Sequence, residues 1–246
     1  MGIGSRHIQL VYLLFAIGIA HCKSPGKEAP ILLYNGAGTS PNDVAAIENL
    51  LSANRLEFSL ANSGQLNGMD KGRLMKYSLI IIPGGDFIKM GEGLTSETAQ
   101  NIREAVHDGL NYLGICAGGF LAGRLPDNDF DFARGVQFSF YAAEDQGIRK
   151  AAVPVSNADG SIIEHYWEDG PQFSGWGEVI SKYPDSTAAT VQGRFGSGRI
   201  ILTGIHPEAP ESWRKAFHFS TSVEQSHEYA AKLIRAALEG KGMTHF

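Results

Sequence analysis

NYLGICAGGFLAG, residues 111–123, joins an apolar run to a cysteine that stands between glycines. The run NYLGI predicts a buried β-strand, and AGGFLAG predicts a short helix directly after it. Cys116 would then occupy the turn between strand and helix, with Gly114 and Gly118 on either side in the spacing G-x-C-x-G. Small residues at these positions allow a sharp turn that exposes the central side chain, as in a nucleophile elbow. The stretch therefore indicates an α/β fold that presents a thiol at the end of a strand.

The alternative for Cys116 is a structural role. A free cysteine is often buried as a small hydrophobic residue, and glycines are common in this chain. Two features favour a nucleophilic role for Cys116. Glycines flank it, and a helix starts next to the sulfur, where the helix dipole stabilises a thiolate.

The chain before the elbow alternates between apolar runs and helical patterns. ILLYN (31–35), LEFSLA (56–61) and YSLIIIPGG (77–85) predict three further strands. Residues 42–54 and 95–109 predict amphipathic helices, the second capped by Thr95 or Ser96 and ended by Gly109. Strands of continuous apolar character predict a mostly parallel sheet covered on both faces, in a three-layer α/β/α sandwich, with a site at the carboxyl ends of the strands.

The second half of the chain is rich in predicted strands. Alternating and apolar runs lie at 135–144, 151–156, 161–169 and 187–208, and a closing helix is predicted over 223–238. No internal repeat, low-complexity tract or linker interrupts the pattern, so we expect one domain over residues 30–240.

Composition excludes several classes of function. The 246 residues are 43% hydrophobic and 19% charged, and the net charge of -5 is spread along the chain, which argues against a nucleic-acid surface. Two cysteines cannot build a disulfide framework, and no Cys/His cluster has the spacing of a zinc site. We expect neither a metal nor a cofactor, so any reaction would depend on individual amino-acid side chains.

The first 22 residues have the build of a signal peptide. Arg6 precedes an apolar run over 8–20 that is too short to span a bilayer comfortably, and Gly18 and Ala20 are small residues placed for cleavage before His21. We therefore expect an exported protein, periplasmic or extracellular, without a stable membrane span in its mature form. Cys22 raises the alternative of a lipid anchor, which His21 disfavours because a small residue is wanted there. An uncleaved anchor or a misassigned start are the remaining alternatives.

A nucleophilic thiol needs a base, and the best placed of the eight histidines is His206. It ends the apolar run RIILTGIHPE, and Pro207 biases it toward extended backbone. In extended backbone His206 and Glu208 point to the same side, so Glu208 can orient one imidazole nitrogen while the other faces Cys116. The alternative is a strand-end histidine beside an exposed glutamate. Together with the elbow, the pair favours a Cys-His-Glu triad.

The turn IIIPGGD (80–86) predicts the donors for an anionic intermediate. A glycine-rich turn after a strand lets a substrate approach the backbone closely. The amides of Gly85 and of Ala117, which directly follows the nucleophile, are the predicted oxyanion hole. The alternative is that PGG is simply a tight turn after a strand, without a catalytic role.

Substrate contacts are predicted next to the elbow and in EHYWEDGPQFSGW (164–176). The aromatic residues of that segment are alternatively core or lid packing, but an aromatic loop with a Gly-Pro pair is able to line the pocket. The tentative contacts are Gly84, Asp86, Gly118, Tyr166, Gly170 and Pro171.

The order of IIIPGGD, GICAGG and G-x-H-P-E resembles the class I glutamine amidotransferase-like superfamily. With NYLGICAGGFLAG and HYWEDGPQF, the chain is most similar to the domain found at the N-terminus of some biotin–protein ligases and as stand-alone bacterial proteins. The resemblance implies a flavodoxin-like sheet with Cys116 as nucleophile, His206 as base and then acid, and Glu208 as orienting residue. It also implies that a carboxylate near the cysteine, for which Asp86 is the candidate, tunes the thiol in related branches.

Three functions follow as hypotheses. The first is an exported cysteine-dependent hydrolase or amidase acting on a small-molecule or peptide-like amide. The second, which the resemblance implies, is a glutaminase-type amidotransferase subunit that forms a glutamyl thioester and releases ammonia for a synthetase. The third is a non-catalytic binding or redox-responsive module, since an activated thiol is also easily oxidised. Substrate, partner and oligomeric state stay open at this level.

Overall fold

Five parallel strands form the centre of the protein. The computed structural model describes Met1 and residues 29–123, 130–133 and 137–246, so the expected signal peptide beyond Met1, with Cys22, lies outside the described residues. The parallel strands, in spatial order, are β2 (Phe58–Ala61), β1 (Ile31–Tyr34), β3 (Leu79–Ile82), β4 (Asn111–Ile115) and β11 (Gly198–Thr203). The four predicted strands of the first half are thus confirmed.

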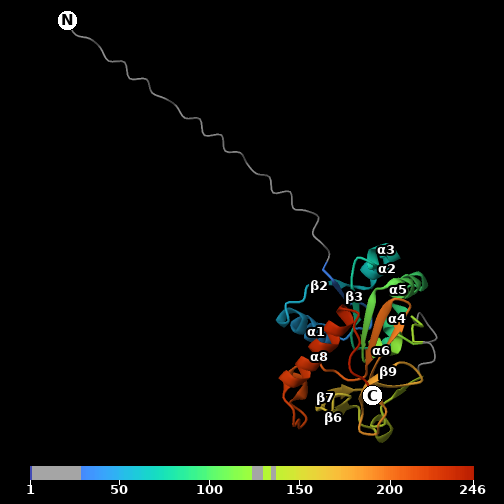
Figure 1. Ribbon diagram of the computed structural model, residues 1–246, viewed down its shortest axis with the longest axis vertical. Coiled ribbons are helices and arrows are strands. Elements are labelled where there is room, and N and C mark those ends of the chain that lie inside the picture. The colour runs from blue at the N-terminus through green and yellow to red at the C-terminus, as the bar shows by residue number, and fades with distance from the viewer. Residues whose placement is uncertain (2–28, 124–129, 134–136) are drawn as a thin grey trace.

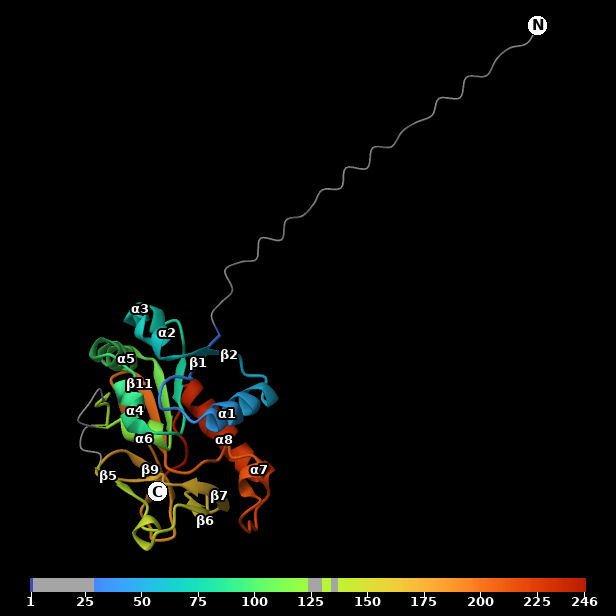
Figure 2. The ribbon, with the colours of Figure 1, turned by 180° about the vertical axis from the view of Figure 1, so that it is seen from behind.

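Helices cover both faces of these strands, which is why the strands are apolar throughout (Figure 1). Leu32 and Ile80 belong to the core under α5 (Ser96–Asp108), whereas Leu33 and Ile81 belong to the core under α1 (Pro41–Ala53) and α8 (Val223–Leu238). Seen from behind, α1 and α8 lie side by side on one face (Figure 2). The predicted α/β/α sandwich of flavodoxin type is confirmed.

The helix ends follow the expected chemistry. The Thr95 side chain accepts a hydrogen bond from the Thr98 amide at the start of α5, and Gly109 ends the helix at φ +129. Ser222 and Gln225 form a capping box at the start of α8. Five shorter helices complete this part: α2 (Ser63–Asn67), α3 (Lys71–Leu74), α4 (Phe87–Glu92), α6 (Ala117–Leu121) and α7 (Glu211–Arg214).

Antiparallel strands extend the sheet beyond β11. The order continues with β10 (Ala188–Phe195), β9 (Glu178–Lys182), β6 (Lys150–Asn157) and β7 (Ile162–Glu168), while β5 (Gln137–Phe140) pairs with β8 (Pro171–Ser174). The short 3-10 helix η1 (Glu144–Gln146) precedes β6. An isolated bridge between Tyr166 and His206 brings β7 to the carboxyl end of β11. The β-rich second half therefore contributes residues to the edge where the elbow lies.

Within the described residues, no helix has both the length and the apolar composition needed to cross a membrane.

Candidate active site

Cys116 occupies a strained turn between β4 and α6. Its backbone lies at φ 49 and ψ -106, a region that non-glycine residues rarely adopt, and its amide donates to the Thr203 carbonyl oxygen at 2.8 Å. The side chain is buried, with 6% of its surface exposed. This is the geometry of a nucleophile elbow.

The glycines of G-x-C-x-G allow close backbone contacts. A Cβ atom on Gly114 would lie 2.3 Å from the Gly118 carbonyl oxygen, and one on Gly118 would lie 2.1 Å from the Ile82 carbonyl oxygen. The spacing is therefore required to seat α6 on β3 and β4. Gly118, a tentative substrate contact, lies in this packing and outside the lining of the cavity described below.

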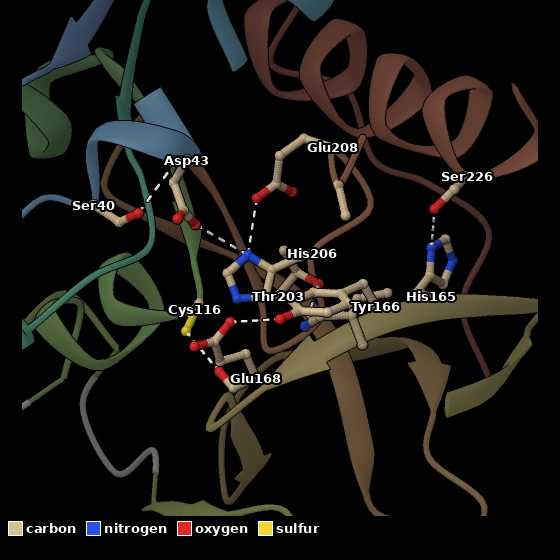
Figure 3. A network of polar contacts seen from close by, with 12 residues as sticks. Ser40, Asp43, Cys116, His165, Tyr166, Glu168, Thr203, His206, Glu208 and Ser226 are labelled. Carbon is tan, nitrogen blue, oxygen red and sulfur yellow. Dashed lines mark hydrogen bonds and ion pairs between the residues drawn. The ribbon is translucent and has the colours of Figure 1, made fainter. Parts of the chain in front are cut away.

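The imidazole of His206 contacts two carboxylates through the same nitrogen. Its Nδ1 lies 2.9 Å from Oε1 of Glu208 and 3.1 Å from Oδ1 of Asp43 (Figure 3). The predicted Glu208 contact is present, but extended backbone does not produce it: Pro207 and Glu208 lie in a turn that the Ala209 amide closes by donating to the His206 carbonyl at 3.2 Å. Asp43 is a residue that the sequence reasoning missed.

Asp43 reaches His206 from the first turn of α1. Its amide donates to the side chain of the N-cap residue Ser40 at 3.3 Å, and an acidic residue at this position is explained locally by the helix dipole. The contact also depends on Gly84, where a Cβ would lie 2.2 Å from Oδ1 of Asp43 and 2.8 Å from Cε1 of His206. Gly84, predicted as a substrate contact, thus packs directly against this ion pair and leaves no space for a side chain.

The three charged groups shift one another's pKa. Burial lowers the pKa of His206, but the negative charges at Cys116, Glu208 and Asp43 outweigh it and raise that pKa well above the usual value. Burial raises the pKa of Asp43, but its close contact with the His206 imidazole leaves the pKa below the usual value. The pair is therefore held as imidazolium and carboxylate.

Glu208 is in a different environment from Asp43. It is fully buried, and its Oε2 has no hydrogen-bond partner among the described residues. A cavity of about 10 Å³ beside it is lined by apolar side chains of α1, β4 and α8. Burial raises the pKa of Glu208, and its contact with His206 opposes this only in part. The two carboxylates on Nδ1 are therefore not equivalent.

The sulfur and the imidazole face the same space. The other ring nitrogen, Nε2, is turned to the side on which Cys116 lies (Figure 3). The Cys116 thiol donates to the Glu168 carbonyl oxygen at 3.6 Å, and among the described residues it forms no hydrogen bond with His206. The Glu168 carboxylate accepts from the Tyr166 hydroxyl at 2.7 Å and pairs with Lys150 at 2.7 Å.

The two residues whose amides are predicted as an oxyanion hole, Gly85 and Ala117, line the same cavity as Cys116. Gly85 and Thr39 form a non-hydrogen-bonded pair in an isolated antiparallel bridge. The N–H of Gly85 therefore points away from the segment that contains Thr39. Its φ of +143 and a Cβ position 2.2 Å from the Gly38 carbonyl oxygen both require glycine. Ala117 is the first residue of α6, where helix amides have no intrahelical acceptor.

A cavity of about 650 Å³ opens above these groups. Of the predicted site residues it is lined by Gly85, Asp86, Cys116, Ala117, Tyr166 and His206. Asp86 caps α4 by accepting from the amides of Ile88 and Lys89.

Gly170 and Pro171 lie behind the site. A Cβ on Gly170 would lie 1.8 Å from the Gly204 carbonyl oxygen, and the Pro171 carbonyl accepts from the Tyr183 hydroxyl at 2.9 Å. Neither lines the cavity.

Among the described residues, one group has donor atoms placed to bind a metal ion: Asp43, His206 and Glu208. Each offers one atom, and the three atoms lie within 4.8 Å of one another. Nδ1 and Oε1 of Glu208 form a hydrogen bond at 2.9 Å, whereas Oδ1 of Asp43, 3.1 Å from Nδ1, makes an ion pair and has no hydrogen-bond partner among the described residues. We therefore interpret the group as an imidazolium between two carboxylates.

Comparison with known proteins defines the class. Residues 29–134 match the family described as "Biotin-protein ligase, N terminal", less than half of the chain. A solved glutamine amidotransferase superposes with a TM-score of 0.58 at 16% identity, covering 82% of this chain and 99% of the other. The fold is thus that of the class I glutamine amidotransferase-like proteins, and the predicted relation to the N-terminal domain of biotin–protein ligases is confirmed.

The chain covers very different shares of two curated relatives. The biotin–protein ligase of Schizosaccharomyces pombe (strain 972) is 27% identical over 160 residues, which are 53% of this chain and 25% of the ligase, so the chain spans about a quarter of that protein. The pyridoxal 5'-phosphate synthase subunit PdxT of Corynebacterium jeikeium (strain K411) is 27% identical over 197 residues, 73% of this chain and 92% of the subunit.

Proposed function

We propose that the protein is a cysteine-dependent amide hydrolase, with Cys116 as nucleophile, His206 as general base and acid, and Glu208 as orienting residue. The observation that carries the proposal is the strained backbone of Cys116 at the junction of β4 and α6. A cysteine that only fills space does not require this conformation, and such strain concentrates at functional sites.

The reaction proceeds in two halves. The Cys116 thiol first gives its proton to Nε2 of His206, which makes a thiolate–imidazolium pair. The sulfur then attacks the amide carbonyl carbon, and the amides of Gly85 and Ala117 stabilise the oxyanion. The C–N bond breaks as His206 returns the proton to the leaving amine, which gives a thioester. Water then attacks the thioester, His206 takes its proton, and the C–S bond breaks to release the carboxylic acid and restore the thiol.

Asp43 belongs to this machinery as a second positioning residue. Its contact with Nδ1 leaves Nε2 as the nitrogen that exchanges protons with Cys116 and substrate. Because Asp43 is held ionised whereas burial opposes the ionisation of Glu208, Asp43 supplies much of the negative charge that favours the imidazolium.

Alkylation of Cys116 by iodoacetamide tests the proposal. We expect the thiol of the full chain to react at about pH 6 at least tenfold faster than a free model thiol, because His206 stabilises the thiolate. Peptide mapping by mass spectrometry separates Cys116 from Cys22. His206→Ala should lose the acceleration, and His218→Ala, at an exposed histidine, should keep it. Reaction of the wild-type thiol at the model rate across the pH range contradicts the proposal.

The similarity to PdxT supports a second candidate, a glutaminase subunit. In that case Cys116 would form a glutamyl thioester and release ammonia for a separate synthetase. Ammonia release from glutamine, measured with the chain alone and then with candidate partner subunits, distinguishes the two. Turnover of glutamine that rises strongly with a partner supports the subunit, and its absence with Cys116 still reactive supports the hydrolase.

We also propose that the protein is exported after cleavage behind Ala20, on the basis of the apolar run over residues 8–20. Intact-mass measurement of protein from the exported fraction should give a chain that begins at His21. Replacing the small residue at the cleavage position, Ala20→Tyr, should leave the longer precursor. A chain that keeps its first 20 residues and stays inside the cell contradicts the proposal.

A further inference from the structure

The cavity above Cys116 has an aromatic wall on the side of α4 and α6. The rings of Phe87 and Phe120 stack with centroids 4.6 Å apart, and Phe120 contacts Phe140 of β5 at 5.4 Å. Phe87 is partly exposed and Phe140 is 40% exposed, so both present ring surface to solvent. We call these three residues the first aromatic wall.

A second aromatic wall stands on the side of His206. Tyr166 contacts Trp213 at 5.6 Å and Phe217 at 6.0 Å between ring centroids, and Trp213 lies 6.0 Å from the imidazole. Trp213 and Phe217 are partly exposed and line the cavity. We call Tyr166, Trp213 and Phe217 the second aromatic wall. Apolar surface gathered on two sides of a reactive thiol is typical of a ligand pocket.

The cations that line the cavity are already paired. Arg149 pairs with Asp169 at 2.6 Å and with Glu144 at 3.2 Å, and Lys150 pairs with Glu168 at 2.7 Å. Free glutamine carries an α-carboxylate and an α-ammonium group. In the described part of the lining, its carboxylate would have to share either cation with an acidic partner that the cation already has.

From the two walls and the paired charges, we propose that the site takes an amide with a bulky aromatic or apolar substituent, in preference to free glutamine. The inference rests on the proposed hydrolase function and names its substrate class. A volume of about 650 Å³ lies in the range of pockets that enclose drug-sized ligands, and offset or edge-on contacts between the walls and a substrate ring would hold the scissile bond over Cys116.

Three electrophiles test the preference on the full chain. They are 2-chloroacetamide, its N-phenethyl derivative and the chloromethyl ketone analogue of glutamine. The second-order rate constant for alkylation of Cys116 is measured for each and divided by the rate constant for a free model thiol. We expect the N-phenethyl compound to exceed 2-chloroacetamide by at least tenfold and to exceed the glutamine analogue.

Variants of the walls locate the preference. Phe217→Ala should lower the ratio of the N-phenethyl rate to the 2-chloroacetamide rate by about fivefold or more, because it removes ring surface from the second wall. Phe87→Ala should do the same from the first wall. Phe219→Ala is the matched control, since its ring stacks under Arg214 and does not line the cavity, and it should keep the wild-type ratio.

The outcomes separate the two proposals. Equal rates for the two chloroacetamides, or a preference for the glutamine analogue, overturn the substrate class while leaving a reactive thiol. A Cys116 that reacts with every compound at the rate of the model thiol contradicts the hydrolase itself. A preference that survives both Phe217→Ala and Phe87→Ala also overturns the assignment, because the walls would then not be its source.

Discussion

Oδ1 of Asp43 lies 3.1 Å from Nδ1 of His206, on the nitrogen that Glu208 also contacts. Two carboxylates therefore approach the one N–H that the ring presents on this side: Glu208 accepts its hydrogen bond and Asp43 makes an ion pair. Together they favour a positive charge on the imidazole, which lines the same cavity as Cys116.

Asp43→Asn should lower the pKa of His206, because it removes one of the negative charges that raise it. The imidazole resonances followed by NMR across pH measure this directly, and alkylation of Cys116 at about pH 6 should slow by roughly tenfold. Asp70→Asn is the matched control, since Asp70 caps α3 by accepting from the Arg73 amide and does not line the cavity. An unchanged titration of His206 in Asp43→Asn would show that the contact does not set its charge.

Asp43→Asn and Glu208→Gln should not act independently. Each single variant leaves one carboxylate on Nδ1, so each keeps part of the reactivity of Cys116. The double variant leaves none, and we expect its alkylation rate to fall to that of His206→Ala. Rates from the four proteins form a double-mutant cycle, and a double variant no slower than either single one would rule out a shared role.

Gly84→Ala tests the packing beneath the ion pair. The added Cβ would meet Oδ1 of Asp43 at 2.2 Å, so the carboxylate must move away from His206. We expect a folded protein with Cys116 alkylation reduced at least as much as in Asp43→Asn. Gly64→Ala, whose Cβ would have its nearest neighbour at 3.5 Å, is the control for the loss of a glycine. Circular dichroism and thermal unfolding confirm the fold, and full reactivity of Gly84→Ala would contradict the described contact.

His165 should make the protein sensitive to acid. It is fully buried, its Nδ1 contacts the Ser226 hydroxyl at 2.7 Å, and its Nε2 has no partner among the described residues. Burial, with the positive charge of Arg214, lowers its pKa to about 3. Between this value and the unfolded value near 6.5 the unfolded state binds more protons, so stability is complete above about pH 6.5 and falls toward pH 3.

Urea unfolding at several pH values measures this contribution. His165→Gln should remove a slope of up to about 1.4 kcal/mol per pH unit from the free energy of unfolding below pH 6.5. The exposed residue His218 provides the control variant His218→Gln, which should keep the wild-type slope. Equal slopes for wild type and His165→Gln would mean that this histidine is not held neutral.

Much of the fold can be predicted from the sequence because the sequence patterns that specify it are local. Continuous apolar strands such as LIII of β3 indicate burial on both faces, and the bounds of α8 agree with those predicted from its apolar period. The elbow is also local, since strand, cysteine and flanking glycines are neighbours in the chain. His206 and Glu208 are also close in the chain, although a turn closed by the bond from the Ala209 amide to the His206 carbonyl, and not the expected extended backbone, brings them into contact.

The remaining parts of the site depend on contacts between distant segments. Gly84 lies against the side chains of Asp43 and His206, and Gly118, Gly170 and Pro171 lie in close backbone contacts that no local pattern reveals. None of the four lines the cavity, and their contacts with substrate stay predictions. The second aromatic wall joins β7 to the segment after β11, which are neighbours because of the bridge between Tyr166 and His206. The sequence around Tyr166, Trp213 and Phe217 shows no pattern that distinguishes these aromatic residues from residues of the core.

By itself, the sequence determined the layered α/β architecture, the elbow at Cys116 and the pairing of His206 with Glu208, because each depends on residues within one turn or one strand of each other. The tertiary structure decided that Asp43 joins them. In the chain Asp43 is an ordinary acid in the first turn of a helix, and only the packing of α1 against the sheet, over the bare backbone of Gly84, brings its charge to the imidazole.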